Sequence, residues 1–600
     1  MKSDFHVLST AMHGRRLQYL LGFTALAAST IFVFIGPLVL GITMDSILGN
    51  EPPQLPGALL NLWNSLGGRE YFLPRLWLPA AALVCTTAFQ GLFTFLQGKA
   101  TASSSEFAAQ NLRTRMYDHI QKLPYDKMDL FSTGDLIQRC TSDIDTIRRF
   151  ITLEAPEIVR TLSMLIIALP LMLSMHPGLT ALALGMVPLL FGFSLFFFLR
   201  VRKAFEKMDE SEARMSTMLQ ESITGVRVVR AFGRQAYEET RFHGHNEEFR
   251  TLTFAVIRNM ALYWSVSSWM SMMQTGLLIV GGTILVINHS TSIGVLVAFL
   301  TIQTHLLFPI RMLGRVLADM GRMAVALGRL REVLEVQTEP QLTEGIRPQI
   351  QGEISVRNLS FSYPDGTEVL RNISFDVRAG ERIGILGATG SGKSTLMHLL
   401  VRLMEYRTGS IRIDGYELRE IAKQHIRSQV ALVLQEPFLF ARTIKGNLTL
   451  ARTTARDEEI IEAAQAACFH EVVNHFEQGY ETMVGERGVT LSGGQKQRLA
   501  LARSLLRETP VLILDDSMSA VDTETEEEIR SALQERNDRL TTLIVSHRIT
   551  TLAAADRILV LDSGRIIDSG THYELIRRPG LYQRVWQMQH QFAVEEETAL

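Results

Sequence analysis

The first half of the chain contains long apolar stretches, and each approaches or exceeds the roughly 20 residues that cross the hydrocarbon core of a bilayer. The first stretch is too long for the core of a signal peptide and lacks a small-residue cleavage site, so we expect it to be retained. The pattern predicts six membrane-spanning helices, over residues 17–46, 73–98, 157–175, 178–201, 258–287 and 292–316.

Basic residues gather in two long connections, one after the second predicted span and one after the fourth, whereas the opposite loops hold almost no Lys or Arg. Cytoplasmic loops carry an excess of these residues, so we expect a multi-pass protein of the cytoplasmic (inner) membrane, with the N-terminus and the C-terminal half in the cytoplasm. Both connections are polar and helical in pattern, which predicts helices that continue past the membrane, turn and return. Their basic residues are Arg113, Arg115, Lys122, Lys127, Arg139, Arg148 and Arg149, then Arg202, Lys203, Lys207, Arg214, Arg227, Arg230, Arg234 and Arg241.

The composition divides at VQTEPQLTEGIRPQIQG, residues 336–352, a polar stretch with Pro and Gly and no apolar periodicity. Strand and turn patterns follow it. We therefore expect a membrane domain at 1–335, a linker at 336–352, a soluble domain at 353–585 and a tail at 586–600.

The net charge and the cysteine content indicate neither a nucleic-acid partner nor a disulfide or zinc site. The 600 residues carry a net charge of -2, which gives no indication of a nucleic-acid partner. Three cysteines, Cys85, Cys140 and Cys468, stand far apart with no Cys or His at ligand spacing, so neither a disulfide framework nor a zinc site is predicted.

A phosphate-binding pattern opens the soluble half. RIGILGATGSGKST, ending at Thr395, places GxxxxGK[ST] between an apolar strand and a helical run. Glycines at 387, 390 and 392 let backbone N–H groups approach phosphate oxygens at a helix N-terminus. Lys393 would reach the β- and γ-phosphates, and the Ser394 hydroxyl would ligate Mg²⁺. The fold class that we predict is a six-helix membrane domain followed by an α/β P-loop domain.

In the stretch VLILDDSMSAVD, residues 511–522, the apolar run VLIL is followed by two adjacent carboxylates, Asp515 and Asp516. Such a run is typical of a strand in a parallel sheet covered on both faces, and ligands bind outside the carboxyl ends of those strands. Beside a phosphate loop, Asp515 is in the right place to hold the Mg²⁺ shell. Asp516 stands where a residue acting on the attacking water would be.

The stretch LSGGQKQR, residues 491–498, resembles the signature of the ATP-binding cassette (ABC) transporters. Six spans followed by this cassette resemble one half of an ABC exporter over the whole chain. Further matches to the family occur in its order, at LPYDKMDLFSTGDLIQRCTSDID (123–145), Tyr363, Gln435, GERG (485–488), SAVD (519–522) and His547.

The resemblance implies a role for each motif. Tyr363 would stack on adenine, Gln435 would touch Mg²⁺ or the water, and His547 would contact the γ-phosphate. Ser492, Gly493 and Gly494 of the signature look like a helix N-terminus with exposed N–H groups, a second anion site. In the family this site closes on ATP held by a second half-transporter, so dimerisation would be obligatory. The residues implied at the two nucleotide surfaces are Gly387, Thr389, Gly390, Ser391, Gly392, Lys393, Ser394 and Thr395 for the chain's own ATP, and Ser492, Gly493, Gly494, Gln495 and Asp522 for the partner's.

Asp516 departs from the family's pattern, in which most active cassettes have Glu after the metal-binding Asp. The Asp side chain is one methylene shorter, about 1.5 Å of reach, and a general base must lie within hydrogen-bond distance of its water. The hypothesis is a heterodimer in which this chain holds a degenerate ATP site. Its intact signature would complete an active site on a partner that has Glu and a divergent signature. A homodimeric lipid or drug flippase is the alternative.

The transported compound is weakly specified. MALYWSVSSWMSMMQ, residues 260–274, offers Met and aromatic side chains for amphipathic drugs, lipids or peptides, although packing explains any one of them as well. Gln303, His305 and Arg311 are polar at membrane depth, which favours a cavity-facing role. A second alternative is an ATP-gated regulatory or channel protein of the same fold. No Ser-rich regulatory insertion separates the domains, which favours the exporter. Import by the same fold is a minor third possibility.

Overall fold

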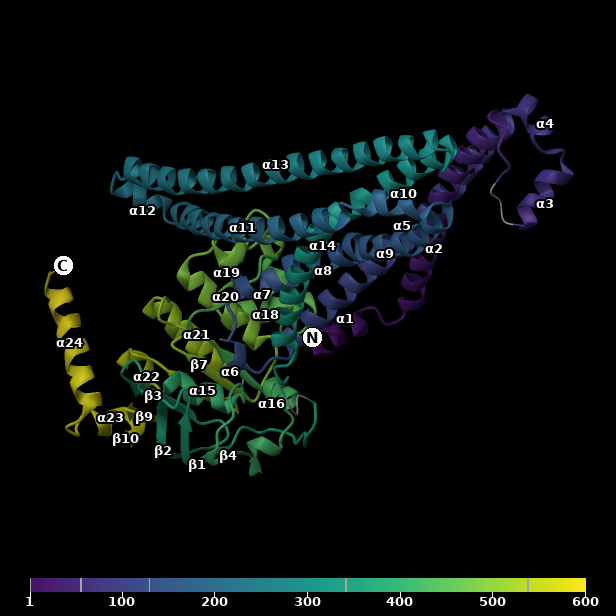
Figure 1. Ribbon diagram of the computed structural model, residues 1–600. Coiled ribbons are helices and arrows are strands. Elements are labelled where there is room, and N and C mark those ends of the chain that lie inside the picture. The colour runs from purple at the N-terminus through teal and green to yellow at the C-terminus, as the bar shows by residue number, and fades with distance from the viewer. Residues whose placement is uncertain (1, 54–56, 129, 340–342, 537–538, 600) are drawn as a thin grey trace. The chain divides into compact units, whose positions relative to one another are not determined.

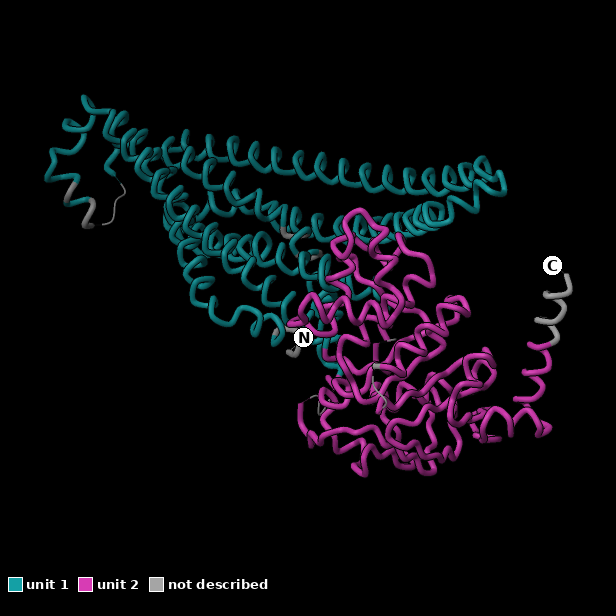
Figure 2. Tube along the Cα trace, turned by 180° about the vertical axis from the view of Figure 1, so that it is seen from behind, with its two compact units in different colours: residues 1–121, 132–336 teal, residues 122–131, 337–600 magenta. Residues whose placement is uncertain are grey.

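The computed structural model describes residues 2–53, 57–128, 130–339, 343–536 and 539–599. Two compact units divide the chain (Figure 2). Residues 1–121 and 132–336 form the first unit, and residues 122–131 and 337–600 form the second. The short segment 122–131 thus belongs to the second unit, although helices of the first unit precede and follow it.

Among the described residues of the first unit, six helices are long and apolar enough to cross a membrane, which confirms the predicted number (Figure 1). Many of their Leu, Ile, Phe and Trp side chains are exposed, as lipid-facing side chains are in a membrane protein. The helices that carry the spans are α2 (Arg16–Ile42), α5 (Trp77–Gln121), α9 (Ala155–Met175), α10 (Pro177–Leu184) with α11 (Val187–Thr224), α13 (Gln235–Ile287) and α14 (Ile293–Leu334).

Several of these helices continue well beyond their apolar portions, as the polar helical patterns predicted. Helices α11 and α13 run side by side to the short helix α12 (Val226–Ala231), which turns the chain between them (Figure 1). Gly233 has a φ of +61°, a conformation that favours glycine at this turn. The other connection contains α6 (Tyr125–Met128), α7 (Thr133–Gln138), η3 (Arg139–Asp143), α8 (Ile144–Arg149) and η4 (Phe150–Glu154) before α9.

The second unit contains two sheets. A four-stranded antiparallel sheet has the order β2-β1-β4-β5, and a six-stranded sheet has the order β10-β9-β3-β8-β7-β6. In the six-stranded sheet all pairs except β10 with β9 are parallel. The strands are β1 (Ile354–Ser362), β2 (Glu368–Val377), β3 (Arg382–Gly387), β4 (Thr408–Ile413), β5 (Tyr416–Glu417), β6 (Val430–Val433), β7 (Val511–Asp515), β8 (Thr541–Val545), β9 (Arg557–Asp562) and β10 (Arg565–Gly570).

Strand β7 is the apolar run at 511–515, and all five of its residues are buried. It pairs in parallel with β8, and β8 pairs in parallel with β3, so the carboxyl ends of the three strands meet at one edge of the sheet. This confirms the prediction of a parallel sheet covered on both faces. The helices used below are α15 (Lys393–Leu400), α16 (Lys423–Gln429), α18 (Asp457–Ala466), α20 (Gly493–Leu505), α21 (Thr523–Arg536) and α24 (Leu581–Ala599).

Candidate nucleotide-binding and membrane sites

The phosphate loop connects β3 to α15, and its glycines stand where a Cβ would clash or where the backbone is left-handed. Gly390 and Gly392 have φ values of +81° and +96°. A Cβ on Gly392 would lie 2.6 Å from a methyl carbon of Leu370, and one on Gly387 would lie 2.5 Å from the Leu561 carbonyl oxygen. The loop therefore keeps its tight path only with glycine at these positions, which leaves its backbone open to a ligand.

Two polar groups of this loop indicate an anion site. The Lys393 ammonium donates to the carbonyl oxygens of Gly387 and Ala388, both at 2.8 Å. Burial lowers the pKa of Lys393, and the carboxylates of Asp515 and Asp516 oppose that shift. The Ser391 hydroxyl is buried without a hydrogen-bond partner. A phosphate would supply the partner that the Ser391 hydroxyl lacks and an acceptor for the third N–H of Lys393, so the loop fits the group that its sequence pattern predicts.

Asp515 and Asp516 lie at the end of β7, as the apolar run predicted, but their surroundings differ. Asp515 is 4% exposed and pairs with Val545 of β8 in the sheet. Asp516 has a φ of +46°, and its N–H donates to the Val545 carbonyl oxygen at 2.9 Å. Asp516 has left-handed backbone angles, so its side chain does not continue the alternation of the strand.

The Asp516 carboxylate meets two of the predicted site residues. Gln435, which follows β6, donates from Nε2 to Asp516 Oδ2 at 3.4 Å. Burial raises the pKa of Asp516, while the charge and backbone N–H of His547 oppose the rise. Gln435, Asp516 and His547 therefore gather outside the carboxyl ends of β6, β7 and β8, and Lys393 and Asp515 adjoin them.

The aromatic residue predicted for adenine lies just after β1. Tyr363 Oη and the Thr395 hydroxyl are 3.1 Å apart, which ties this ring to the first turn of α15. The ring also packs edge-on against Phe361, with 5.3 Å between centroids. Tyr363 is thus held beside the helix that begins at Lys393.

The signature stretch forms the start of α20, the helix N-terminus that the sequence predicted. The Ser492 hydroxyl accepts from the Gln495 N–H, and the Gln495 side chain accepts from the Ser492 N–H at 2.9 Å. A Cβ on Gly494 would lie 2.7 Å from the Ala520 carbonyl oxygen, so this helix approaches the SAVD stretch closely. Among the described residues, no hydrogen bond of Ser492 or Gln495 joins the chain's own phosphate loop.

The SAVD stretch is joined to the signature helix and to α21. Gln497 accepts from the Ala520 N–H at 2.9 Å and donates to the Ser519 hydroxyl at 3.2 Å. Asp522 accepts from the Thr525 N–H at 2.9 Å, and this backbone bond holds the pKa of its carboxyl below the ordinary value. Asp522 is therefore anionic and exposed at the start of α21, where it caps the helix.

The sequence pattern did not identify one contact of the segment 122–131. Tyr125 of α6 lies edge-on to His398 of α15, with 5.3 Å between ring centroids. His398 is half-buried, its Nδ1 has no hydrogen-bond partner, and burial lowers its pKa. No spacing rule joins residues 125 and 398, so this contact between α6 and the phosphate-loop helix could be found only in the fold.

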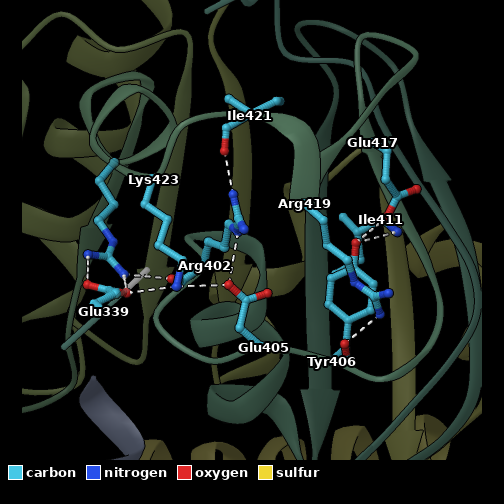
Figure 3. Close-up of polar contacts among 10 residues, drawn as sticks. Glu339, Arg402, Glu405, Tyr406, Ile411, Glu417, Arg419, Ile421 and Lys423 are labelled. Atoms are coloured by element: carbon cyan, nitrogen blue, oxygen red, sulfur yellow. Dashed lines mark hydrogen bonds and ion pairs between the residues drawn. The ribbon is translucent and has the colours of Figure 1, made fainter. Parts of the chain in front are cut away.

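A second feature that the sequence missed is a buried ion-pair network around Glu339, just after the first unit ends (Figure 3). Arg427 forms two hydrogen bonds to the Glu339 carboxylate, at 2.6 and 2.9 Å, and Lys423 lies 3.1 Å from it. Lys423 also pairs with Glu405 at 2.8 Å. Although burial opposes it, Arg427 and Lys423 hold the pKa of Glu339 below its ordinary value.

This network fastens the beginning of the linker to α16. The side chains of Lys423 and Glu339 are 4% and 9% exposed, so both charges are removed from water. The Glu339 N–H also donates to the Lys122 carbonyl oxygen at 2.7 Å, which joins the linker to segment 122–131. Arg402 extends the network to Glu405 at 3.1 Å and to the Ile421 carbonyl (Figure 3).

The polar residues predicted to face a membrane cavity have different surroundings. His305 lines a cavity of about 540 Å³ between α9 and α14 in the first unit. Gln303 is 2% exposed and donates to the Thr275 hydroxyl of α13 at 3.2 Å, so it joins two helices. Arg311 donates to the Ser268 hydroxyl at 3.0 Å, and its guanidinium lies over the Trp264 ring.

Comparisons with known proteins agree with this arrangement. Residues 19–310 match the family described as the ABC transporter transmembrane region, and residues 370–519 match the family described as ABC transporter. An uncharacterised ABC transporter ATP-binding protein of Bacillus subtilis, YknU, is 33% identical over 571 residues and covers 94% of each chain.

Two further proteins are similar over nearly the whole chain. An ATP-dependent lipid A-core flippase of Pseudomonas aeruginosa is 33% identical over 570 residues, which are 92% of this chain and 94% of the flippase. The solved structure of a bacterial Atm1-family ABC exporter with ATP bound superposes with a TM-score of 0.77 at 26% identity. That match covers 96% of this chain and 99% of the exporter.

Proposed function

This chain belongs to the ABC transporters as an exporter half with a fused transmembrane region and ATPase domain, and from that premise we propose that it exports amphipathic compounds as one half of a heterodimer. ABC half-transporters dimerise, so the chain works with a second half. Its own ATP site is proposed to be degenerate. The second half is proposed to be a different chain that carries Glu after its metal-binding Asp and a divergent signature.

Asp516 carries this proposal. Its backbone is held against β8, because Asp515 pairs with Val545 in the sheet and the Asp516 N–H donates to the Val545 carbonyl oxygen. A backbone shift that would recover the missing reach of about 1.5 Å would break these bonds. A misplaced general base typically costs about 10²–10⁴ in rate. Two such sites in one dimer would make a slow pump, whereas the intact signature of this chain would serve a partner's ATP.

The remaining site residues take the roles that their positions support. Lys393 and the loop of Gly387, Gly390 and Gly392 would hold phosphates, with Thr389, Ser391 and Thr395 around them and Tyr363 against adenine. Oxygen donors of Ser394, Gln435 and Asp515 suit Mg²⁺, which prefers hard ligands and, when bound, neutralises charge on the phosphates. His547 would donate to the γ-phosphate. Ser492 to Gln495 and Asp522 would face the partner's nucleotide.

ATP binding drives transport in this proposal because the closed pair of cassettes binds ATP better than the open pair. The N-terminus and the ATPase domain would lie in the cytoplasm, as the distribution of basic residues supports. The transported compound would be amphipathic or hydrophobic, and the similarity to a lipid A-core flippase supports a lipid-like cargo.

The alternative is a homodimeric flippase in which Asp516 acts as a slow general base. The similarity to an ATP-dependent lipid A-core flippase of Pseudomonas aeruginosa favours the flippase part of this alternative.

The deciding experiment compares ATPase rates of the co-purified complex. Asp516→Asn should leave most turnover intact, whereas Gln in place of the partner's Glu should nearly abolish it. Asp516→Glu is the matched variant, because it restores the reach at this site and should raise the rate. If Asp516→Asn alone stops hydrolysis, or the purified chain turns over at full rate by itself, the homodimer replaces the heterodimer.

A further inference from the structure

The cavity of about 540 Å³ between α9 and α14 is large enough for a small ligand or a lipid headgroup. Leu153 of η4 and Glu157, Arg160 and Met164 of α9 recur at helical spacing along the cavity, so they share one face. The lining residues of α14 share a face in the same way and are Thr304, His305, Phe308, Pro309, Met312 and Arg315.

Charged residues gather at one end of the cavity, its polar end, where Arg315 lies near Glu154, with 3.9 Å between Nη2 and Oε1. Met164 lies about 10 Å farther along α9 than Glu157. The lining beyond the charges is mixed, with the apolar side chains of Met164 and Phe308 beside the polar side chains of Thr304 and His305. Such a lining suits an amphiphile whose headgroup contacts the charges and whose chain contacts the apolar side chains.

The charges at the polar end are incompletely satisfied. Glu157 Oε2 and Arg160 Nε are 3.7 Å apart, beyond a good hydrogen bond, and Arg160 Nε is buried without a partner. Glu154 is 8% exposed, and its buried Oε2 receives no hydrogen bond from a donor. Unsatisfied ionic groups at membrane depth are costly, and they mark sites where a ligand or ion passes.

Both signs of charge occur side by side at this end. A purely anionic ligand at Arg160 would meet the Glu157 carboxylate, and a purely cationic ligand at Glu157 would meet the guanidinium of Arg160. A ligand that carries both charges a few bonds apart would satisfy both residues at once. We propose that this cavity binds zwitterionic amphiphiles, with the anionic group at Arg160 and Arg315 and the cationic group at Glu157. This inference rests on the proposed export function and names its substrate class.

The test uses the purified transporter in neutral detergent, with three single-chain probes of equal chain length. They are lysophosphatidylethanolamine, which is zwitterionic, lysophosphatidylglycerol, which is anionic, and an alkylammonium. Equilibrium binding is measured without ATP, and ATPase stimulation is measured separately. The zwitterion should bind at least about tenfold tighter than either singly charged probe, as a charge-assisted contact to each group predicts. Equal binding of the three probes overturns the inference.

Two variants test which cavity residue binds the cationic group of the ligand and which binds the anionic group. Glu157→Gln should weaken zwitterion binding about tenfold and leave the anion unchanged or tighter, whereas Arg160→Gln should weaken both and spare the alkylammonium. Arg202→Gln and Glu206→Gln are matched controls, because this pair is exposed on α11 and should not alter the preference. If both cavity variants keep the wild-type preference, the site is elsewhere. Intact ATPase activity without any charge preference would contradict this inference alone, whereas absent ATPase activity would contradict the proposed function.

Discussion

The nucleotide-binding unit and the membrane cavity of this chain hold their charged groups in different ways. In the nucleotide-binding unit, Lys393 and Glu339 make hydrogen bonds or ion pairs of 2.6 to 3.1 Å. In the membrane cavity, the pairs of Glu157 and Glu154 are 3.7 and 3.9 Å long and leave buried polar atoms unsatisfied. A fixed set of partners suits one ligand of constant shape. Loosely held charges suit cargo that differs from one molecule to the next.

The largest effect should follow from Glu339→Ala, which removes the buried carboxylate shared by Lys423 and Arg427 and leaves Lys423 paired with Glu405. We expect a loss of about 3 kcal/mol in the stability of the nucleotide-binding unit, at the lower end of the cost of breaking a buried ion pair, because Lys423 keeps one partner. Hydrogen exchange at α16 measures it. Glu368→Ala removes an exposed pair to Arg371 and should cost under about 1 kcal/mol. Equal losses of stability for the two variants would mean that the buried ion pair of Glu339 stabilises the unit no more than the exposed pair of Glu368.

The stability that the Glu339 ion pairs contribute should depend on pH. The pKa of Glu339 is lowered in the folded chain, so its stabilisation is complete above its unfolded pKa of about 4.3. The stabilisation is lost as the pH falls through the lower folded value.

Lys393→Ala should weaken ATP binding at the chain's own site by about 10–100-fold, since the ammonium makes charge-assisted hydrogen bonds to phosphate. Photolabelling of each chain with an ATP analogue measures the site separately. Lys445→Ala is the control, because Lys445 pairs with Asp457 outside the site. Unchanged labelling of the Lys393 variant would contradict the assignment.

Tyr363→Ala should weaken nucleotide binding by about 1–3 kcal/mol through loss of a stacking surface. Tyr363→Phe keeps the ring and removes only the bond to Thr395, so it should bind nearly as well as the original chain. Titration with a fluorescent ATP analogue compares the two. A Phe variant as weak as the Ala variant would assign the role to the hydroxyl instead of the ring.

Glu154→Gln should have the smallest effect. Its ion pair to Arg315 is long, and Asp319 is a like-charged neighbour, so removing the charge costs little. We expect the thermal midpoint to change by no more than about 2 °C, because the free-energy change is within about 0.5 kcal/mol. A loss as large as that for Glu339→Ala would mean that the membrane charges are held as firmly as those of the nucleotide unit.

The sequence predicted those parts of the molecule that depend on local spacing. The apolar run before Asp515 predicted a buried parallel strand, and the Ser492 stretch predicted a helix N-terminus, because both patterns lie within a few residues. The pairing of Glu339 with Arg427 joins residues 88 positions apart. Tyr125 and His398 are farther apart still. Such contacts depend on how the elements pack, which a single sequence does not encode in any short pattern.

The polar residues of the membrane helices also have neighbours that a short sequence pattern does not predict. His305, Gln303 and Arg311 lie within nine residues of one another, and their polarity alone predicted one role for all three. The fold gives each a different neighbour, since α14 turns His305 toward the cavity, Gln303 toward Thr275 and Arg311 toward Trp264. Periodicity predicts that such a helix exists, but the angle about its axis is fixed by the helices around it.

Segment 122–131 gives the nucleotide-binding unit a discontinuous origin in the chain. A chimaera that exchanged only residues 337–600 with those of another exporter would pair a foreign His398 environment with the original Tyr125, and a foreign linker with the original Lys122 carbonyl. The natural unit of exchange between such transporters is therefore two pieces of sequence. Recombination that keeps the ten-residue piece with its cassette would preserve these contacts, whereas a single crossover in the linker would separate them.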